Sequence, residues 1–376
     1  MKVVLSKKAL SEALQKISSS IAKNPTMQIL SSVKMSVNNG KASLRATNLE
    51  SETVCPIDLE SASTDRDFLL PFDIMSKVAK SATSSVININ IEHEDSVGDK
   101  IQISSGKTNL NFSSPSAENF PEIVNNQEMQ ECCSLDNSVL LNLINNTSFS
   151  ISKNTERYNL TGLYFKLNDS KLTTVSTDGH RLSIDSTAVE SDQEIDFIVP
   201  AKPTQELKKM LKAKNSCQLL LDSERSKVQF QIEGVTFSSK LLDATFPDYE
   251  RIIPQDNDKI LEADTKNFLS ALERVKIIND LKGKGVQMEI KSDAITFTAK
   301  ADNGSQIKDE IECSFLSSNN EALTVTYNPE FLEEPLKAMQ ADKFRMVLSE
   351  ENRPALINSL TSTSANYVIM PMRNEN

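Results

Sequence analysis

The chain has 376 residues, which suits two or three domains, and its 38% hydrophobic and 25% charged residues are ordinary for a globular protein. No apolar run approaches the roughly 18 residues of a membrane helix, and the opening MKVVLSKKAL lacks a signal peptide's apolar core, so we expect a cytoplasmic protein without membrane contact. The net charge of −11 argues against general attraction to nucleic acid but permits a local basic surface.

Cysteine and glycine usage argue against several kinds of site. The five cysteines form no CxxC pair, and Cys132 and Cys133 are adjacent, which does not suit metal ligation, so we interpret the cysteines as reduced structural thiols. Glycine occurs only nine times, and the nearest approach to a phosphate loop, KGKGV (282–286), matches neither the Rossmann nor the P-loop pattern. We therefore expect no nucleotide-dependent enzyme, no cofactor and no metal site.

The first predicted element is an amphipathic helix in KKALSEALQKISSSI (7–21). Its apolar stripe has the spacing of one helix face and consists of Leu10, Ala13, Leu14, Ile17 and Ile21. The same spacing recurs about 130 residues later in DNSVLLNLINNTSFSIS (136–152), and after a similar step in DTKNFLSALERVKIIN (264–279). Each later copy places one polar residue in the stripe, Thr147 and Asn279. This recurrence predicts an internal repeat.

A second predicted element recurs at nearly the same step. FLLPFDIMSKVAKSA (68–82), FIVPAKPTQELKKML (197–211) and LTVTYNPEFLEEPLKAM (323–339) each begin as a strand and enter a helix through Pro, Asn or Asp. Because proline removes a helix hydrogen bond, we expect a kink or an early break at Pro335.

The segments between these helices alternate polar and apolar residues. The clearest are SVININIEH (85–93), NLTGLYFKL (159–167), SKVQFQIEG (226–234), AITFTAK (294–300) and FRMVLSE (344–350). Such alternation predicts half-buried antiparallel strands. Two units also end alike, since FSSPSAENFPEI (112–123) and FSSKLLDATFPDYERI (237–252) share Phe-Ser-Ser and a later Phe-Pro. We therefore expect an α+β protein of three tandem domains, 1–125, 126–253 and 254–376, each with two helices on antiparallel sheets.

Five motifs, in order along the whole chain, resemble those of the bacterial DNA polymerase III beta subunit, the beta sliding clamp. They are PTMQIL (25–30), TNLE (47–50), TDGHRL (177–182), FPDY (246–249) and YVIMPMR (367–373). The resemblance implies a head-to-tail homodimer closed into a ring, with helices lining a hole around duplex DNA. It implies a processivity factor rather than an enzyme. The alternative is a repeat-built interaction scaffold that does not encircle DNA.

TDGHRL places an Asp, a His and an Arg within four residues, which raises the question of catalysis. No nucleophile or metal-ligand spacing accompanies His180, and His93, the other histidine, lies in another repeat, so we expect no catalytic residue. Asp178-Gly179 between KLTTVS and HRLSID instead predicts a tight two-residue hairpin.

By the resemblance, this hairpin borders a hydrophobic pocket that binds short peptide motifs. The implied partners are the replicative polymerase alpha subunit, the clamp loader delta subunit, other polymerases and repair proteins. Arg181 and Arg251 would hold the polar part of a peptide, and methionines would adapt to different partners. The implied pocket residues are Leu160, Thr177, Gly179, His180, Arg181, Leu182, Pro247, Arg251, Ile252, Asn328, Pro354, Val368, Met370, Pro371, Met372 and Arg373.

Lysines gather on the predicted helices, for example Lys8, Lys16 and Lys77, whereas Glu333 and Glu334 offset them in the third repeat. Lysine also suits any solvated helix face, which is the alternative explanation. A sliding ring needs phosphate attraction without base contacts, and flexible lysines suit it. The implied DNA contacts are Lys23, Asn24, Lys80, Tyr158, Lys202, Lys209 and Lys212, and Asn24 stands where family members carry a basic residue.

Ring closure is implied at the strand TNLNF (108–112), which would pair with the third domain of the other subunit. Lys107 would face acidic residues such as Asp309, Glu310 and Glu312. The implied interface residues are Lys107, Leu110, Phe112, Ile277 and Ile278.

Overall fold

The structure is a computed structural model that describes residues 1–22, 24–94, 98–123, 128–211, 215–278, 285–301, 303–317, 321–360 and 364–373. The chain divides into two compact units, Met1–Leu140 with Lys202–Leu242, and Leu141–Ala201 with Asp243–Asn376. The strands of the predicted central domain are shared between them. The predicted boundary at 125/126 lies outside the described residues, and the one at 253/254 lies between a 3-10 turn, η6 (Glu250–Ile252), and strand β18 (Lys259–Asp264).

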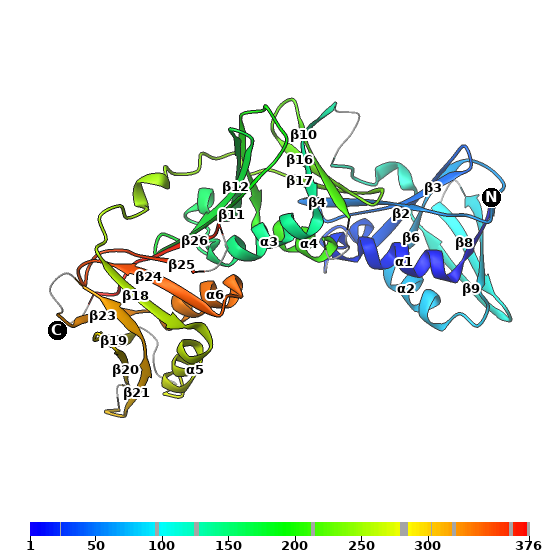
Figure 1. Cartoon of the computed structure of the whole chain (residues 1–376). Coiled ribbons are helices and arrows are strands. Elements are labelled where there is room, and N and C mark those ends of the chain that lie inside the picture. The colour runs from blue at the N-terminus through cyan, green and yellow to red at the C-terminus, as the bar shows by residue number, and fades with distance from the viewer. Residues whose placement is uncertain are drawn as a thin grey trace. The chain divides into compact units, whose positions relative to one another are not determined.

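The described residues form six helices, and all of them were predicted. They are α1 (Lys7–Ile17), α2 (Phe72–Ser81), α3 (Asn137–Thr147), α4 (Ala201–Met210), α5 (Thr265–Val275) and α6 (Pro329–Met339). In the first unit α1 and α2 lie side by side, and in the second α5 and α6 do (Figure 1). The predicted repeat of two helices per domain is therefore confirmed for the described chain.

The first unit contains two antiparallel sheets, ordered β5-β1-β7-β8-β9 and β10-β15-β16-β17-β4-β3-β2-β6 (Figure 1). Their strands are β1 (Lys2–Ser6), β2 (Ser32–Asn38), β3 (Lys41–Thr47), β4 (Ser51–Ile57), β5 (Ser61–Ala62), β6 (Arg66–Pro71), β7 (Val86–Glu94), β8 (Gly98–Ser105), β9 (Thr108–Ser114), β10 (Met129–Asp136), β15 (Ser216–Asp222), β16 (Lys227–Ile232) and β17 (Val235–Lys240). The longer sheet joins two repeats, because β17 pairs with β4.

The second unit is built in the same way, with sheets ordered β14-β11-β12-β13-β26-β25-β24-β18-β22 and β21-β20-β19-β23. Besides β18, their strands are β11 (Gly162–Asn168), β12 (Lys171–Thr177), β13 (Arg181–Ala188), β14 (Ile195–Pro200), β19 (Val286–Ile290), β20 (Ala294–Lys300), β21 (Gln306–Glu312), β22 (Ser314–Leu316), β23 (Leu323–Tyr327), β24 (Lys343–Leu348), β25 (Ala355–Ser359) and β26 (Asn366–Ile369). Here β26 pairs with β13, so this sheet also joins two repeats.

The apolar stripes explain why the helices pack where they do. In α1 the buried residues are Leu10, Ala13, Leu14 and Ile17, as predicted, and Ser6 caps the helix by accepting a hydrogen bond from the Ala9 amide. In α5 Phe268 is fully buried and meets Phe297 and Phe344 edge-on at 5.1 and 4.9 Å. Burial of each such side chain contributes about 1.5–3 kcal/mol, which fixes the helices on their sheets.

Of the two polar residues predicted in the later apolar stripes, Thr147 lies among the described residues and Asn279 does not. Thr147 is buried, and its hydroxyl donates to the Leu143 carbonyl at 2.6 Å, so the helix itself satisfies this group. Asn279 lies outside the described residues.

Of the two outcomes predicted at Pro335, the early break is wrong, because α6 continues through this residue to Met339, and the kink stays a prediction. Proline inside a helix costs about 3 kcal/mol through its missing amide hydrogen and its ring. Burial of Pro335 together with Leu332 and Leu336 offsets this cost, and Asn328 caps the helix start by accepting from the Glu330 amide at 2.9 Å.

Candidate peptide-docking surface and DNA interface

The TDGHRL motif forms a turn between β12 and β13. Thr177 Oγ1 donates to the Arg181 carbonyl at 2.6 Å and accepts from the Gly179 amide at 3.1 Å. Asp178 Oδ1 accepts from the amides of His180 and Arg181 at 2.9 and 3.1 Å, and Gly179 has a φ of +89°. The hairpin is confirmed, but three residues rather than the predicted two separate the strands, because the Asp178 carboxylate satisfies two backbone donors in a wider turn.

Arg181 is held inside the protein rather than presented to solvent. Its side chain is 10% exposed, and its guanidinium donates to Asp178 Oδ2 at 3.1 Å and to the Phe149 carbonyl at 2.9 Å. A third donor pairs with Glu334 on α6, and the Phe331 ring lies 4.5 Å from the guanidinium carbon. Arg181 therefore joins β13 to α6, and its contact with a bound peptide stays a prediction.

The C-terminal strand lies directly beside this turn. The Met370 amide donates to the His180 carbonyl at 2.9 Å, and the Met372 amide donates to the Thr326 carbonyl at 2.8 Å. Val368 and Leu182 are buried in the sheet, whereas Met370 is 39% exposed. The structure thus brings together the hairpin and the YVIMPMR segment, as the resemblance implied.

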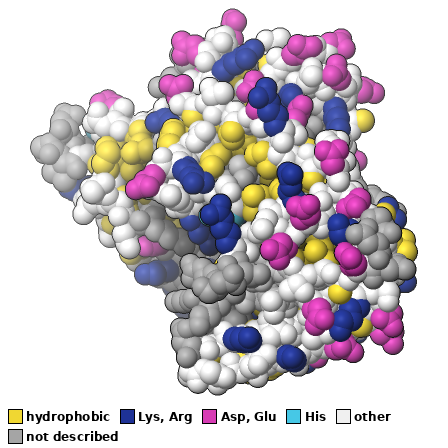
Figure 2. Space-filling model, turned by 90° about the vertical axis from the view of Figure 1, so that its left-hand side faces the viewer, with side chains coloured by type: hydrophobic (Ala, Val, Ile, Leu, Met, Phe, Trp, Pro, Cys, Tyr) yellow, Lys and Arg dark blue, Asp and Glu magenta, His cyan; other side chains and the backbone are white. Residues whose placement is uncertain are grey.

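A third segment, FPDYERI (246–252), approaches the same part of the second unit. Phe246 stacks on Tyr164 of β11 at 4.6 Å, and Tyr249 meets Tyr164 edge-on at 6.2 Å. Burial raises the pKa of the Tyr249 hydroxyl above its ordinary value. These rings anchor the segment and leave Ile252 41% exposed. On the face of the molecule in Figure 2, hydrophobic side chains gather among Lys, Arg, Asp and Glu.

The remaining predicted pocket residues differ in their exposure. Leu160 and Thr177 are buried; Asn328, Pro354, Pro371 and Met372 are half-buried; Gly179, His180, Pro247, Arg251 and Arg373 are exposed. Arg251 pairs with Asp248 at 2.7 Å, with its side chain 85% exposed. Asn328 is the helix cap of α6, so its amide oxygen is already occupied. Phe149, Phe331 and Glu334 surround Arg181 but were not among the predicted residues, since they are distant from it in the chain.

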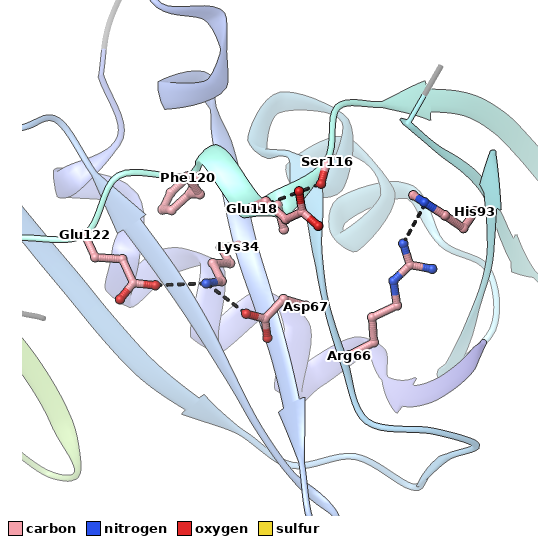
Figure 3. Close-up of a pocket in the computed structure, with 9 residues that line it drawn as sticks. Lys34, Arg66, Asp67, His93, Ser116, Glu118, Phe120 and Glu122 are labelled. Atoms are coloured by element: carbon pink, nitrogen blue, oxygen red, sulfur yellow. Dashed lines mark hydrogen bonds and ion pairs between the residues drawn. The ribbon is translucent and has the colours of Figure 1, made fainter. Parts of the chain in front are cut away.

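A polar cavity of about 560 Å³ lies in the first unit (Figure 3). Lys34 on β2 lies between Asp67 and Glu122, at 2.8 Å from a carboxylate oxygen of each. On the opposite wall Arg66 lies 3.0 Å from His93 Nδ1. The cavity collects residues from four separate segments, so no local motif signalled it. Its charged walls do not resemble the apolar pocket expected for peptide motifs.

The predicted DNA contacts are scattered over helices and loops. Lys80 on α2 and Lys209 on α4 are exposed, and Lys202 on α4 pairs with Glu50 at 3.4 Å. Tyr158 opens η5 (Tyr158–Leu160) and is 52% exposed. Asn24 is also exposed, with a φ of +52°. Lys23 and Lys212 lie outside the described residues.

The predicted ring-closure residues lie at two sheet edges. In the described sheets β9 is an edge strand of the first unit and β21 an edge strand of the second. On β9 Leu110 and Phe112 are half-buried, and Lys107 in the preceding turn is exposed. In the second unit Ile277 is 70% exposed and Ile278 is half-buried.

Comparison with known proteins decides the family. Models of three domains of the DNA polymerase III beta subunit match in succession: the N-terminal domain at residues 1–124, the central domain at 134–248 and the C-terminal domain at 250–373. The chain belongs to the DNA polymerase III beta subunit family. Its members are the beta sliding clamps, non-catalytic processivity factors of DNA polymerase III, so three clamp domains and a non-enzymatic role are confirmed.

Individual relatives agree over their whole length. The beta sliding clamp of Vibrio cholerae is 28% identical over 375 residues, covering 99% of this chain and 100% of the relative. That of Escherichia coli K12 is 29% identical, with the same coverage. The crystal structure of the DNA polymerase III subunit beta from Pseudomonas aeruginosa is 27% identical, with a TM-score of 0.92 over 99% of this chain and 100% of that one. In addition, no helix of the described residues is long and apolar enough to cross a membrane.

Proposed function

We propose that two copies of this chain close head to tail into a ring that encircles duplex DNA and tethers the DNA polymerase to it. The succession of three clamp domains carries this proposal. Two edge strands of the described sheets support it, because β9 belongs to the first domain and β21 to the third, and neither has a described strand along its outer edge. Pairing β9 of one copy with the third domain of the other would bury Leu110 and Phe112 against Ile277 and Ile278, with Lys107 facing the acidic residues of β21.

The DNA contact is proposed to be electrostatic and independent of sequence. The exposed lysines on the helices, together with Asn24 and Tyr158, would meet phosphates rather than base edges. Such contacts hold the duplex without fixing the ring at one site.

The surface around the TDGHRL turn is proposed to bind short peptide motifs of partner proteins. Those partners would be the replicative polymerase alpha subunit, the clamp loader delta subunit, and other polymerases and repair proteins. Met370, exposed and hydrogen-bonded through its amide to the turn, supports this use, as does exposed Ile252 in the same unit, because an adaptable apolar surface with nearby polar groups suits several ligands.

Ring closure is tested first by measuring mass in the analytical ultracentrifuge. We expect a dimer of 41.7 kDa subunits, which Leu110→Asp dissociates by placing a carboxylate in the buried contact. Leu316→Asp is the matched control: this residue is 65% exposed on β22, outside the proposed contact, and its variant should stay dimeric. A wild-type monomer at micromolar concentration contradicts a stable ring.

Encirclement is tested by retention on DNA. Wild-type protein loaded on a closed circular plasmid should stay bound and should leave once the plasmid is linearised, because a ring slides off free ends. Equal retention on circular and linear DNA contradicts encirclement. Absence of DNA binding alongside intact peptide binding would favour the interaction-scaffold alternative.

A further inference from the structure

Charge is distributed unevenly over the six helices. The helices α1, α2 and α4 contain eight lysines against three acidic residues, one of which, Glu206, is buried. In contrast, α5 and α6 contain three basic and four acidic residues, and α3 contains no charged residue. The excess of positive charge on the helices is therefore confined to the first-domain pair and α4.

Ion pairs increase this difference in positive charge between the two groups of helices. Among the described residues Lys16, Lys77, Lys80 and Lys209 are exposed and form no ion pair. On the third-domain helices Arg274 pairs with Asp309 of β21 at 2.6 Å. That leaves Lys266 as the unpaired cation of α5 and α6 in the described chain.

Glu333 on α6 is the centre of the third-domain pairing. Its carboxylate binds both Lys276, just beyond α5, and Lys337, one turn further along α6. The side chain of Glu333 is 13% exposed, whereas that of Lys337 is 53% exposed. Burial raises the pKa of this carboxyl, but hydrogen bonds from the two lysines outweigh burial and hold the pKa below its ordinary value. Glu333 is thus an internal counterion for two ammonium groups of the third domain, those of Lys276 and Lys337.

A lysine attracts DNA by replacing the counterions of phosphates, and an ammonium already neutralised by a carboxylate does this poorly. We propose that, in the encircling ring, duplex DNA is held by the lysines of α1, α2 and α4, and that Glu333 keeps Lys276 and Lys337 of the third domain from contributing. This inference rests on the proposed encirclement. Around the ring, segments that attract DNA strongly would then alternate with third-domain segments that attract it weakly.

The test is a gain of function. Glu333→Gln removes the counterion and frees Lys276 and Lys337, so affinity for a short fluorescent duplex should rise at least about threefold at low salt, with a steeper salt dependence. Glu351→Gln is the matched control, because it removes the same charge from an exposed turn between β24 and β25 and should change affinity less than twofold. Equal effects of the two variants, or no effect of Glu333→Gln, overturn the proposal.

Loss of function supplies the second arm. Lys80→Ala should weaken binding several-fold, whereas Lys337→Ala, which removes an exposed lysine of α6 already paired with Glu333, should change it less than twofold. If both variants lose the same affinity for DNA, the proposal that some helices hold the DNA and others do not is overturned. Encirclement itself would still be supported if circular DNA retains the wild type. A wild type that circular DNA does not retain overturns both. Dimer mass and melting temperature verify that each variant is folded.

Discussion

The turn at residues 47–51 and the turn at 177–181 have one hydrogen-bond scheme and two different surroundings. Thr47 Oγ1 donates to the Ser51 carbonyl at 2.9 Å, and Asn48 Oδ1 accepts from the amides of Glu50 and Ser51 at 3.0 and 2.9 Å. Thr177 and Asp178 make the same bonds in the second turn. Each turn then pairs its second strand with a strand of the next repeat, so the repeat has duplicated one joint between domains.

The two joints are closed by different chemistry. In the first, the buried carboxylate of Glu206 on α4 accepts from Asn48 Nδ2 at 3.1 Å and from Ser51 Oγ. In the second, Arg181 stands at the position of Ser51 and reaches Glu334 on α6. Glu206 thus accepts hydrogen bonds from neutral donors in the first joint, whereas Glu334 forms an ion pair with Arg181 in the second.

The chain that follows each joint also differs. The amide that bonds to the turn belongs to Lys240 in the first joint and to Met370 in the second. Lys240 is exposed and charged, whereas Met370 exposes an adaptable apolar side chain. The turn geometry thus serves domain joining, whereas the proposed docking surface depends on what surrounds the second turn.

The largest expected effect is loss of the second joint in Arg181→Ala. Removal of a side chain that is 10% exposed leaves Glu334, Asp178 and the Phe149 carbonyl without their donor, so unfolding free energy should fall by about 3 kcal/mol. Urea denaturation measures this. Arg251→Ala is the control, because that arginine is 85% exposed and its pair with Asp248 should matter by less than about 1 kcal/mol. Similar losses in the two variants would show that Arg181 is not a joint.

The first joint should break less severely. Glu206→Ala leaves the buried Asn48 and Ser51 donors unsatisfied, which should cost about 2 kcal/mol in the same assay. Burial raises the pKa of Glu206 above its ordinary value, against hydrogen bonding by Ser51 and the charge of Lys202. The folded chain therefore keeps this proton to higher pH than the unfolded chain.

A pH series checks the direction of that shift. The contribution of Glu206 should be fully present below the ordinary pKa of 4.5 and should decline as pH rises toward the raised value in the folded protein. The stability difference between wild type and Glu206→Ala should accordingly be greatest in acid and smaller near neutral pH. A stability difference that grows with pH would mean that burial is not the largest influence on the pKa of the Glu206 carboxyl.

Local spacing in the sequence was sufficient to predict much of the fold, but it predicted few of the contacts within either joint. The stripe of Leu10, Leu14 and Ile17 reveals a helix because residues three and four apart share one face. The Arg181 contact with Glu334 spans 153 residues, and that of Asn48 with Glu206 spans 158. Contacts at such separations depend on the pairing of distant strands, which periodicity does not specify. The shared Thr-Asx spacing of TNLES and TDGHR was the one available signal that these are equivalent joints.

Exchange of one residue tests the docking surface proposed at the second joint. Met370→Lys introduces the residue that follows the first joint, and it should weaken binding of a synthetic motif peptide from a polymerase alpha subunit about tenfold, or about 1.4 kcal/mol. Because Met370 is 39% exposed, the melting temperature should change little. Lys240→Met is the reciprocal control and should leave affinity unchanged. Unchanged binding by Met370→Lys would remove this residue from the surface.

The smallest expected effect distinguishes the two turns themselves. Gly179 has a φ of +89°, and the corresponding Leu49 has a φ of +73°. Gly179→Ala should cost about 1 kcal/mol, because a Cβ disfavours this backbone region. Leu49→Gly relieves a similar strain but loses contacts of a side chain that is 38% exposed and gains chain entropy in the unfolded state, so it should change stability by less than about 0.5 kcal/mol. Thermal melting of both variants measures these changes in stability. A clear stabilisation by Leu49→Gly would mean that the leucine side chain contributes no stability to the first joint. Its strained backbone would then be retained for contact with something outside the folded chain.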